Sequence, residues 1–409
     1  MTTKNILRFA IALLIAASPA AASAQTSDEG FIFGRVFTAD NEVYSGVIRW
    51  GKEEIYWSDM FNSTKTENPN IRYLSSRDLD YVENDRDNWR SFTKWNGRSE
   101  YKHQFVCRFG DIQSLSISGR KTVVLTLKNG EIVELRGGSN DIGTRLRVYD
   151  VELGELTIKW NRIERIEFSE TPSTLDYKFG DPVYGTVNTR RGSFTGLVIW
   201  DKDERIGTDE LDGESRNGDL EIPFRNIARI EKYRSGSRVI VKSGRELYLT
   251  GTNDVDSDNR GIIVTDEDLN RYEIPWSEFR DVSFDPKPST SGRPYSGFAP
   301  PKQITGSVTL RGGQVHTGRI VYDLDESYGF EVLEGEDGGI EYNIPFFNIA
   351  KIAPRGYNSA EVTLKGGKMI RLNESQDVSD RNDGILVFGK EGSDPVYLPW
   401  TNIDVIEFD

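Results

Sequence analysis

The strongest constraint on the fold is a phrase that the chain repeats three times. The stretches LTIKWNRIERIEF, YEIPWSEFRDVSF and VYLPWTNIDVIEF end at Phe168, Phe284 and Phe408. Upstream of each lies an alternation of β-branched and polar residues, a Lys-x-Gly turn and a second alternation, which is typical of a β-hairpin. A polar loop and a further apolar strand complete a unit of roughly 50 residues, named unit B.

A related unit, named unit A, precedes each unit B. The stretches GRVFTADNEVYSGVIRW, GTVNTRRGSFTGLVIWD and GSVTLRGGQVHTGRIVYD align through Gly34, Gly185 and Gly306, and each unit A ends much as unit B does. Almost no stretch has helical periodicity. The sequence therefore predicts an all-β protein that contains the A–B pair three times.

The shared ending of the units predicts two strands joined by one tight helical turn. In several copies a proline biases the apolar residue before it to extended geometry and ends the strand. The aromatic that follows is Trp160, Trp276 or Trp400 in unit B and a phenylalanine in unit A. A position that accepts either residue is expected to lie in the core rather than in a sugar-stacking ladder.

The final strand of each unit is expected to close against the first strand of the same unit. Strand alternation then places Ile406 and Phe408 on one buried face and points Glu407 outward. Burial of this face explains why the phrase recurs wherever a sheet closes.

The units resemble SH3-like and Sm-like small barrels. IPFRNIARI is similar to the proline, turn and last strand that end SH3-like barrels, and VYGTVNTRRGSFTGLVIWD is similar to the first Sm motif. The resemblance implies three tandem modules, each a pair of small β-barrels. It carries over no function, because the peptide-binding aromatics of SH3 domains and the basic RNA-facing residues of Sm rings have no counterpart here. A six-bladed β-propeller with one four-stranded blade per unit is the alternative architecture.

Composition and repeat boundaries predict the domain organisation. The first residues combine Lys4 and Arg8 with a short apolar run and a small-residue cleavage site after Ala24, which is typical of a secretory signal peptide. We therefore expect an exported protein without a transmembrane segment after cleavage, located in the periplasm or, as the alternative, outside the cell or on its surface. The expected segments are 1–24 signal peptide, 25–33 N-terminal extension, 34–170 first barrel pair with an insertion at 59–104, 171–182 linker, 183–285 second pair, 286–303 Pro-rich linker and 304–409 third pair.

Charge and cysteine content narrow the classes of partner. The formal net charge is −14, and the signal peptide carries basic but no acidic residues, so the mature chain is more acidic still. Such a chain lacks the basic footprint that nucleic acids require, and we expect no nucleic-acid partner. Cys107 is the single cysteine, which excludes an intramolecular disulfide.

Sequence patterns for catalysis and metal binding are absent. His103 and His316 are the only histidines, and no nucleophile motif accompanies them. One cysteine and two scattered histidines do not make a closed zinc site. The run from Asp254 to Asp258 has acids at alternate positions but lacks the glycine and glutamate of a helix–loop–helix calcium site, so a turn is favoured over calcium binding. We expect no enzymatic activity, no metal and no cofactor.

Each unit A carries two acids at the third and fourth positions after an aromatic residue. Such a pair can meet a basic partner or a loosely held cation, or it can keep an exposed loop tip solvated and protect a sheet edge. The solvated tip is the favoured interpretation. The pairs are Glu53 with Glu54, Asp203 with Glu204, and Asp325 with Glu326.

The insertion at 59–104 is the one region that breaks the repeat. Loops on a rigid scaffold concentrate binding residues, and tryptophan and tyrosine are favoured at interfaces. The insertion is therefore either a ligand-binding loop or a lid whose aromatics pack back onto the first barrel. Its aromatic candidates are Tyr73, Tyr81, Trp89, Trp95 and Tyr101.

Together these features predict a non-catalytic envelope protein that binds or scaffolds other exported proteins. Repetition of a chemically plain barrel creates surface, and a tandem array gains avidity. The alternative is a carbohydrate- or cell-wall-binding protein that uses the aromatic insertion.

Overall fold

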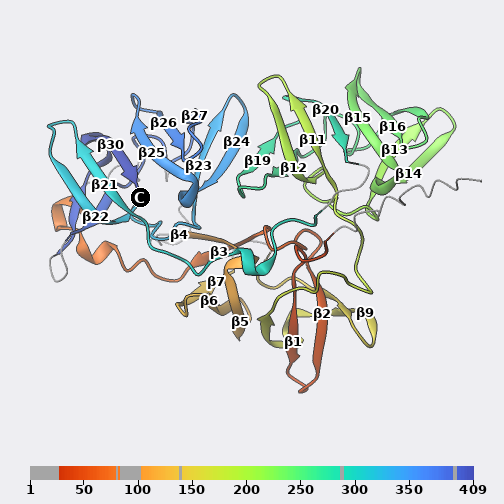
Figure 1. Cartoon of the computed structure of the whole chain (residues 1–409), viewed down its shortest axis with the longest axis horizontal. Helices are drawn as coiled ribbons and strands as arrows, with labels where there is room; N and C mark the ends of the chain where they lie inside the picture. Colours follow the sequence, from red (N-terminus) through yellow and green to blue (C-terminus); the bar gives the residue numbers. More distant parts are fainter. Residues whose placement is uncertain (1–26, 80–81, 83–102, 138–140, 286–289, 390–393) are drawn as a thin grey trace, which may run out of the picture.

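The computed structural model of the chain describes residues 27–79, 82, 103–137, 141–285, 290–389 and 394–409. These residues form an all-β protein of large antiparallel sheets, which confirms the expected fold class. Three groups of ten strands follow one another along the chain and are named modules 1, 2 and 3. Modules 2 and 3 lie side by side, and module 1 lies across their junction (Figure 1).

Module 1 comprises the first ten strands and their connecting turns. They are β1 (Phe33–Thr38), β2 (Val43–Trp50), β3 (Met60–Lys65), η1 (Ile71–Tyr73), β4 (His103–Arg108), η3 (Phe109–Asp111), β5 (Ile112–Gly119), β6 (Thr122–Leu127), β7 (Ile132–Arg136), β8 (Leu146–Asp150), β9 (Gly154–Ile158), η4 (Trp160–Arg162) and β10 (Ile163–Phe168).

Modules 2 and 3 repeat this succession of elements. Module 2 has β11 (Tyr184–Thr189), β12 (Ser193–Ile199), β13 (Glu210–Ser215), β14 (Gly218–Pro223), η5 (Phe224–Asn226), β15 (Ile227–Tyr233), β16 (Gly236–Val241), β17 (Glu246–Leu249), β18 (Ile262–Thr265), β19 (Arg271–Ile274) and β20 (Phe279–Phe284). After η6 (Tyr295–Gly297), module 3 has β21 (Thr305–Leu310), β22 (Val315–Val321), β23 (Val332–Asp337), β24 (Ile340–Pro345), η7 (Phe346–Asn348), β25 (Ile349–Pro354), β26 (Ser359–Leu364), β27 (Met369–Asn373), β28 (Ile385–Phe388), β29 (Val396–Leu398), η8 (Trp400–Asn402) and β30 (Ile403–Phe408).

The strand order corrects the expectation that each unit closes on itself. In module 1 the order is β4-β3-β7-β6-β5-β10-β1-β2-β8-β9. Strands β1 and β2 of unit A pair with β10 and β8 of unit B, and β6 and β7 of unit B pair with β5 and β3 of unit A. The two halves of the module 1 sheet are β4-β3-β7-β6-β5 and β10-β1-β2-β8-β9, and each half combines strands of both units. The sequence did not show this, because alternation fixes the face of a strand but not its partner.

The same order recurs in the other modules. In module 2 the hairpin β13–β14 forms a separate small sheet, tied to the end of β17 by a bridge between Glu214 and Thr250. Strands β5 and β10 join the two halves of module 1 in one sheet, and β15–β20 and β25–β30 do so in modules 2 and 3. These continuous sheets do not match the alternative expectation of six separate propeller blades.

The closing strand β30 illustrates both the success and the error of the sequence prediction. Ile406 lies opposite Val308 on β21 and Ile352 on β25 and is fully buried. Phe408 is partly exposed and packs against the same core. The expected buried face is confirmed for Ile406 and in part for Phe408. The expected partner is wrong, because β30 pairs with the first and last strands of unit A rather than with the first strand of its own unit.

Short 3₁₀ turns separate the last two strands of five of the six units, as the shared ending predicts. In the remaining unit the N–H groups of Glu278 and Phe279 donate to the carbonyl of Pro275 instead. Trp160, Trp276 and Trp400 are buried, which confirms their core role.

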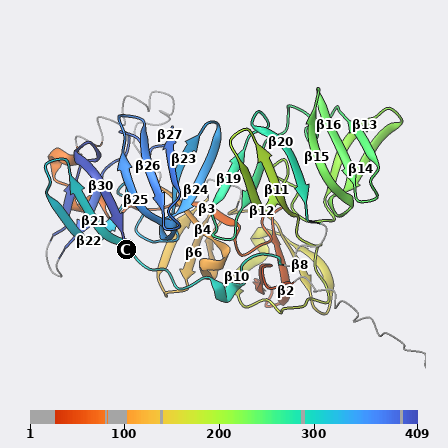
Figure 2. The ribbon, with the colours of Figure 1, turned by 45° about the horizontal axis from the view of Figure 1, so that its top comes forward.

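Two large cores place the modules relative to one another. One core runs through modules 2 and 3 together, and β19 pairs with β24 across their junction. The core of module 1 takes in Leu269 from module 2 and Phe330 from module 3. The view in Figure 2 shows modules 2 and 3 side by side above module 1.

Both segments expected to be linkers contact the modules in their described parts. The indole N–H of Trp57 donates to the hydroxyl of Thr171 at 3.0 Å, and that hydroxyl donates to the carbonyl of Phe31. Phe298 packs into the core of module 1, and the hydroxyl of Tyr295 donates to the carbonyl of Ile112 at 2.8 Å. These contacts make the segments structural parts of the assembly.

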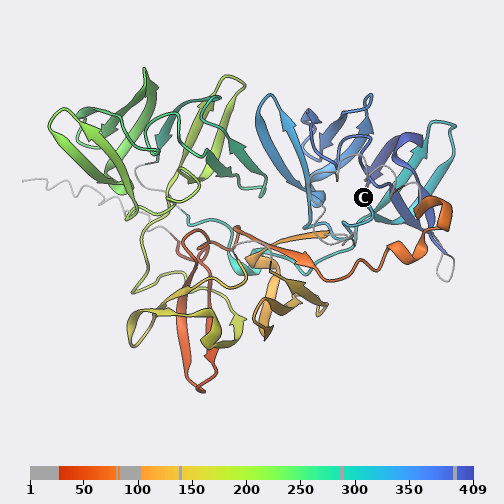
Figure 3. The same ribbon diagram turned by 180° about the vertical axis from the view of Figure 1, so that it is seen from behind.

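The first part of the insertion crosses from module 1 to module 3 (Figure 3). Leu74 and Val82 form a small buried cluster with Val321, Leu324 and Leu386 of module 3. Among the described residues, no helix is long and apolar enough to cross a membrane.

Candidate functional site: a charged cleft between modules 1 and 2

The modules are joined at three equivalent turns that follow the second strand of each unit A. In each turn one carboxylate oxygen accepts two backbone N–H groups. Asp59 accepts from Ile55 and Tyr56 at 2.7 and 2.8 Å. Asp209 and Glu331 make the same pair of contacts in modules 2 and 3. We name these three residues the turn carboxylates.

Each turn carboxylate binds a cation that belongs to a different module. Arg205 of module 2 lies 2.5 Å from Asp59, and the two side chains are 3% and 8% exposed. Arg49 of module 1 binds Asp209 through both terminal nitrogens, at 3.0 and 3.2 Å. Lys65 of module 1 lies 3.1 Å from Glu331 and 2.8 Å from a second acid, Asp325. Module 1 is therefore fixed to both of the other modules by charged groups that are largely shielded from water.

Arg108 adds an anchor of another kind at the point where all three modules meet, because its partners are backbone carbonyls rather than carboxylates. Its side chain is buried and donates to the carbonyl of Leu269 in module 2 at 2.6 Å and to that of Phe330 in module 3 at 3.2 Å. Burial lowers the pKa of Arg108 to about 10, so the guanidinium remains charged at neutral pH.

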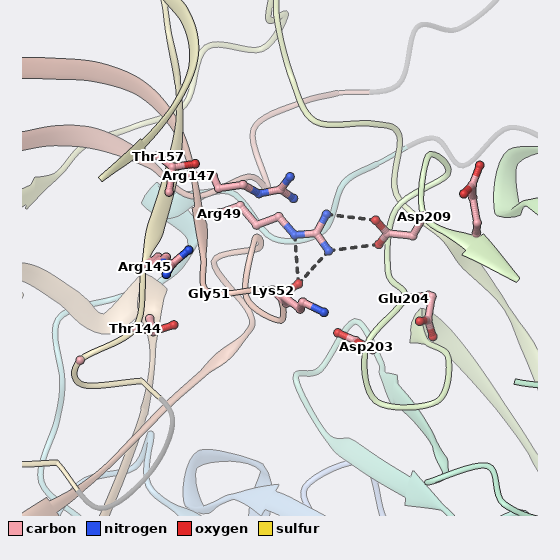
Figure 4. A pocket seen from close by; sticks show the side chains of 12 residues that line it. Arg49, Gly51, Lys52, Thr144, Arg145, Arg147, Thr157, Asp203, Glu204 and Asp209 are labelled. Atoms are coloured by element: carbon pink, nitrogen blue, oxygen red, sulfur yellow. Dashed lines mark hydrogen bonds and ion pairs between the residues drawn. The ribbon is translucent and has the colours of Figure 1, made fainter. Parts of the chain in front are cut away.

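Beside the Arg49–Asp209 contact lies an open cleft of about 760 Å³ (Figure 4). Its module 1 wall is basic and its module 2 wall is acidic, and two threonine side chains, Thr144 and Thr157, lie on the basic side. The basic residues are Arg49, Lys52, Arg145 and Arg147, and the acidic residues are Asp203, Glu204, Asp209 and Glu210.

The cations of the cleft differ in their availability to a ligand. Arg49 is saturated, because it donates to the carbonyl of Lys52 as well as to Asp209. Arg147 lies 3.3 Å from Glu155 on the neighbouring strand. The side chains of Lys52 and Arg145 are exposed and have no hydrogen bond or ion pair to any residue that the structure describes. These two cations are therefore free to bind an anionic group.

A buried carboxylate cluster lies behind the acidic wall. Carboxylate oxygens of Asp201, Glu204 and Asp254 lie within 4.8 Å of one another. Burial and, secondarily, the charge of Asp254 raise the pKa of Glu204 to about 9, and burial raises the pKa of Asp254 to about 6. Arg260 lies 2.8 Å from Asp201. Carboxylate oxygens are ligands that Ca²⁺ prefers, but a protonated Glu204 and the Arg260 guanidinium already offset the negative charge of the cluster.

An anchoring hydrogen bond beside this cluster recurs in all three modules. The indole N–H of Trp50 donates to the backbone carbonyl of Asp141 at 2.8 Å, and the indole N–H of Trp200 donates to the backbone carbonyl of Asp254 at the same distance. In module 3 the hydroxyl of Tyr322 donates to the backbone carbonyl of Asp377 at 2.6 Å. These contacts tie a loop of unit B to the second strand of unit A. The recurrence indicates that this hydrogen bond helps to hold the two units together.

The structure corrects the interpretation of the acidic pairs as solvated loop tips. Glu54 is buried, and Glu204 and Glu326 each have a carboxylate oxygen shielded from water without a hydrogen-bond partner. Burial raises the pKa of Glu54 and Glu326 well above the ordinary value. The first acids of the pairs, Glu53, Asp203 and Asp325, are partly exposed. The sequence signal for the cluster is an aspartate, Asp141, Asp254 or Asp377, that opens the equivalent loop of every unit B.

The other candidates divide between described and undescribed parts of the chain. Tyr73 packs edge-on against Phe388 of module 3, with ring centroids 5.2 Å apart, so this part of the insertion contacts module 3 rather than the first module. The N–H of Asp258 donates to the side chain of Asp256 at 3.0 Å, as expected for a turn, whereas Asp254 points into the carboxylate cluster. The candidates Tyr81, Trp89, Trp95 and Tyr101 lie outside the described residues.

No sequence pattern indicated the turn carboxylates or the basic wall of the cleft, whereas Asp203 and Glu204 of the acidic wall belong to one of the acidic pairs noted in the sequence. Asp59 and Arg205 are 146 residues apart in the chain, and neither lies in a motif that suggests its partner. Pairing of this kind depends on how the modules pack.

Comparisons with known proteins add no identification. No protein-family model matches the chain, and no curated protein matches it. A solved structure described as a streptogramin B lyase is 13% identical, covers 73% of this chain and 94% of its own, and has a TM-score of 0.12. A likeness at that TM-score carries no argument about fold or function.

Proposed function

We propose that this chain is a non-catalytic exported protein that binds other exported proteins in the cleft between modules 1 and 2. The observation that carries the proposal is the lining of the cleft. Lys52 and Arg145, two cations without a partner among the described residues, face an acidic wall that includes Asp203 and Glu210.

The opposed charges of the two walls suit a polypeptide segment that has side chains of both signs. Carboxylates of such a segment would contact Lys52 and Arg145, and its basic groups would contact Asp203 and Glu210. Complementary charge of this kind orients a partner and speeds association more than it raises raw affinity. We place the encounter in the periplasm, in line with the expected signal peptide.

The rigid attachment of module 1 supports the same proposal. The contacts Arg205–Asp59 and Arg49–Asp209 fix the two walls before any ligand arrives. A preformed site loses less conformational entropy on binding than a flexible one. We retain the resemblance to SH3-like and Sm-like barrels as a proposal for the ancestry of the units, without a functional implication.

A pull-down from envelope extract tests the proposal. The double substitution Lys52→Glu and Arg145→Glu should abolish capture of the partner, because it turns the basic wall acidic. A matched control reverses Arg120 and Lys121, two exposed cations of the same module that lie in the turn between β5 and β6. Equal capture by all three proteins would contradict the cleft as the binding site.

A sedimentation assay with purified cell-wall material separates protein binding from the carbohydrate alternative. We expect no co-sedimentation. Tyr73 is the aromatic candidate of the insertion that the structure describes, and its ring packs against Phe388. This contact does not favour a sugar-binding platform in that part of the insertion. Saturable binding to cell wall that survives the cleft substitutions would favour the alternative.

A further inference from the structure

Modules 2 and 3 are joined by the pairing of two sheet edges. Tyr272 on β19 lies opposite Tyr342 on β24, and their rings meet edge to face with centroids 5.2 Å apart. The acids Glu273 and Glu341 also face each other, and Glu273 is bound by Lys202 at 2.7 Å. This joint gives a direct example of how one module of this chain recognises another.

The same two kinds of edge remain open at the outer ends of the module pair. In strand order, β19 is the last strand of module 2 and β24 is the first strand of module 3. Their equivalents are β29 at the end of module 3 and β14 at the start of module 2. Within the described residues, β29 pairs only with β28 and β14 pairs only with β13.

The residues of the open edges fit the joint that they would form. The alignment of VYLPW with YEIPW puts Val396 at the position of Tyr272, and that of LEIPF with YNIPF puts Leu220 at the position of Tyr342. Val396 is 43% exposed and Leu220 is partly exposed. The central contact of the joint would therefore be an apolar pair across two strands, which is a stabilising combination.

We propose that β29 of one copy of this chain pairs antiparallel with β14 of a second copy, as β19 pairs with β24 within the chain. The register places Val396 opposite Leu220, Pro395 opposite Glu221 and Tyr397 opposite Asp219. Strand addition to an open edge supplies main-chain hydrogen bonds. Proline is tolerated at an edge, although Pro395 has no N–H to donate. Because the two surfaces differ, each added copy brings one further edge of each kind, and head-to-tail assemblies larger than a dimer result, either open filaments or closed rings.

Strand β9, at one of the two edges of the module 1 sheet, is a weaker partner for β14. In the equivalent register Glu155 would lie opposite Glu221, and like charges directly opposite each other destabilise a strand pair. The β29 edge places an uncharged proline there instead. The copies carry the same negative net charge, −14 for the full chain, and repel one another, so screening by salt should strengthen the association.

Sedimentation velocity at increasing protein concentration tests the proposal. Wild-type protein should form species larger than a dimer. Val396→Lys and Leu220→Lys should each be monomeric, because each blocks one of the two edges. An equimolar mixture of these variants should form a dimer and nothing larger, since only the intact β14 of the first can pair with the intact β29 of the second. Leu156→Lys on β9 is the matched control and should associate like the wild type.

Several outcomes would overturn the proposal. The first is a wild type that is monomeric at every concentration. The second is a mixture of Val396→Lys and Leu220→Lys that stays monomeric. The third is a Leu156→Lys variant that no longer associates while Val396→Lys and Leu220→Lys still do. If Leu220→Lys melts below the wild type, Asp219→Cys coupled to a bulky maleimide after folding blocks the same edge. Asp219 is exposed, whereas the native Cys107 is buried and should stay unlabelled.

Discussion

The guanidinium of Arg205 in module 2 lies 2.5 Å from the carboxylate of Asp59 in module 1, and both side chains are shielded from water. The same Asp59 carboxylate also holds the turn at Ile55 and Tyr56 through two backbone N–H groups. One carboxylate thus links the local conformation of a turn to the packing of two modules. This double role leads to a specific expectation about stability.

Substitution of either partner should destabilise the protein strongly. Arg205→Met leaves a buried carboxylate without its cation, and Asp59→Asn leaves a buried guanidinium without its anion. Breaking a buried pair in this way costs about 3–5 kcal/mol. The double variant should lose much less than the sum of the two, because neither charge is then unpaired. Urea unfolding of the four proteins gives the coupling free energy, and additive losses would contradict a buried interaction.

An exposed pair in the same module provides the control. Arg162 and Asp40 lie 2.8 Å apart, with side chains 58% and 56% exposed. Asp40→Asn should change the free energy of unfolding by at most about 1 kcal/mol, because water screens the pair.

Arg108 should determine whether module 1 stays at the junction of the other two. Arg108→Met removes two charge-assisted hydrogen bonds, each worth about 1.5–3 kcal/mol, and leaves the carbonyls of Leu269 and Phe330 without that donor. Arg108→Lys can reach one carbonyl and should be intermediate. We expect a lower melting temperature and a larger radius of gyration in solution scattering. A methionine variant as compact and stable as the wild type would contradict this role.

Glu204 should make the protein less stable as the pH rises. Its pKa in the folded chain is raised from 4.5 to about 9, mainly by burial. Between these two values the folded chain retains a proton that the unfolded chain releases, so unfolding becomes easier with rising pH. For one proton the slope is at most about 1.4 kcal/mol per pH unit.

Thermal melts across that pH range check this prediction. Glu204→Gln should flatten the dependence and should melt above the wild type at the alkaline end, because the amide stays neutral. Glu246→Gln removes an exposed carboxyl of the same module that lies outside the cluster, and it serves as the matched control. A glutamine variant with an unchanged pH profile would rule out the buried proton.

Removal of the last four residues, 406–409, should unfold more than the end of module 3. Ile406 is fully buried, and loss of its burial alone costs about 1.5–3 kcal/mol. The strand also joins both halves of the module through Val308 and Ile352, and the core of module 3 continues into module 2. We expect calorimetry to show a single transition shifted to lower temperature. A separate, unshifted transition for module 2 would mean that the shared core does not couple the modules.

The sequence alone determined the local features of this protein. Alternation predicted the strands and the buried side of Ile406, because successive side chains of a strand point to opposite faces whatever the partner is. The shared ending predicted the helical turn and the buried aromatics such as Trp400, because the constraint that proline places on its predecessor is local. These features depend on neighbours within a few residues, which the sequence shows directly.

Only the tertiary structure decided which strands pair and where the charges go. Units A and B have the same alternation, so β30 fits the first strand of either unit, and packing selects β21. The sequence suggests that Glu204 lies in an exposed loop. The pairing of a unit A strand with a unit B strand instead brings Asp254 beside Glu204, and the Glu204 side chain joins the carboxylate cluster. Asp59 and Arg205 meet because module 1 packs across module 2. Partner choice depends on contacts between residues far apart in the chain, and a local pattern holds no information about them.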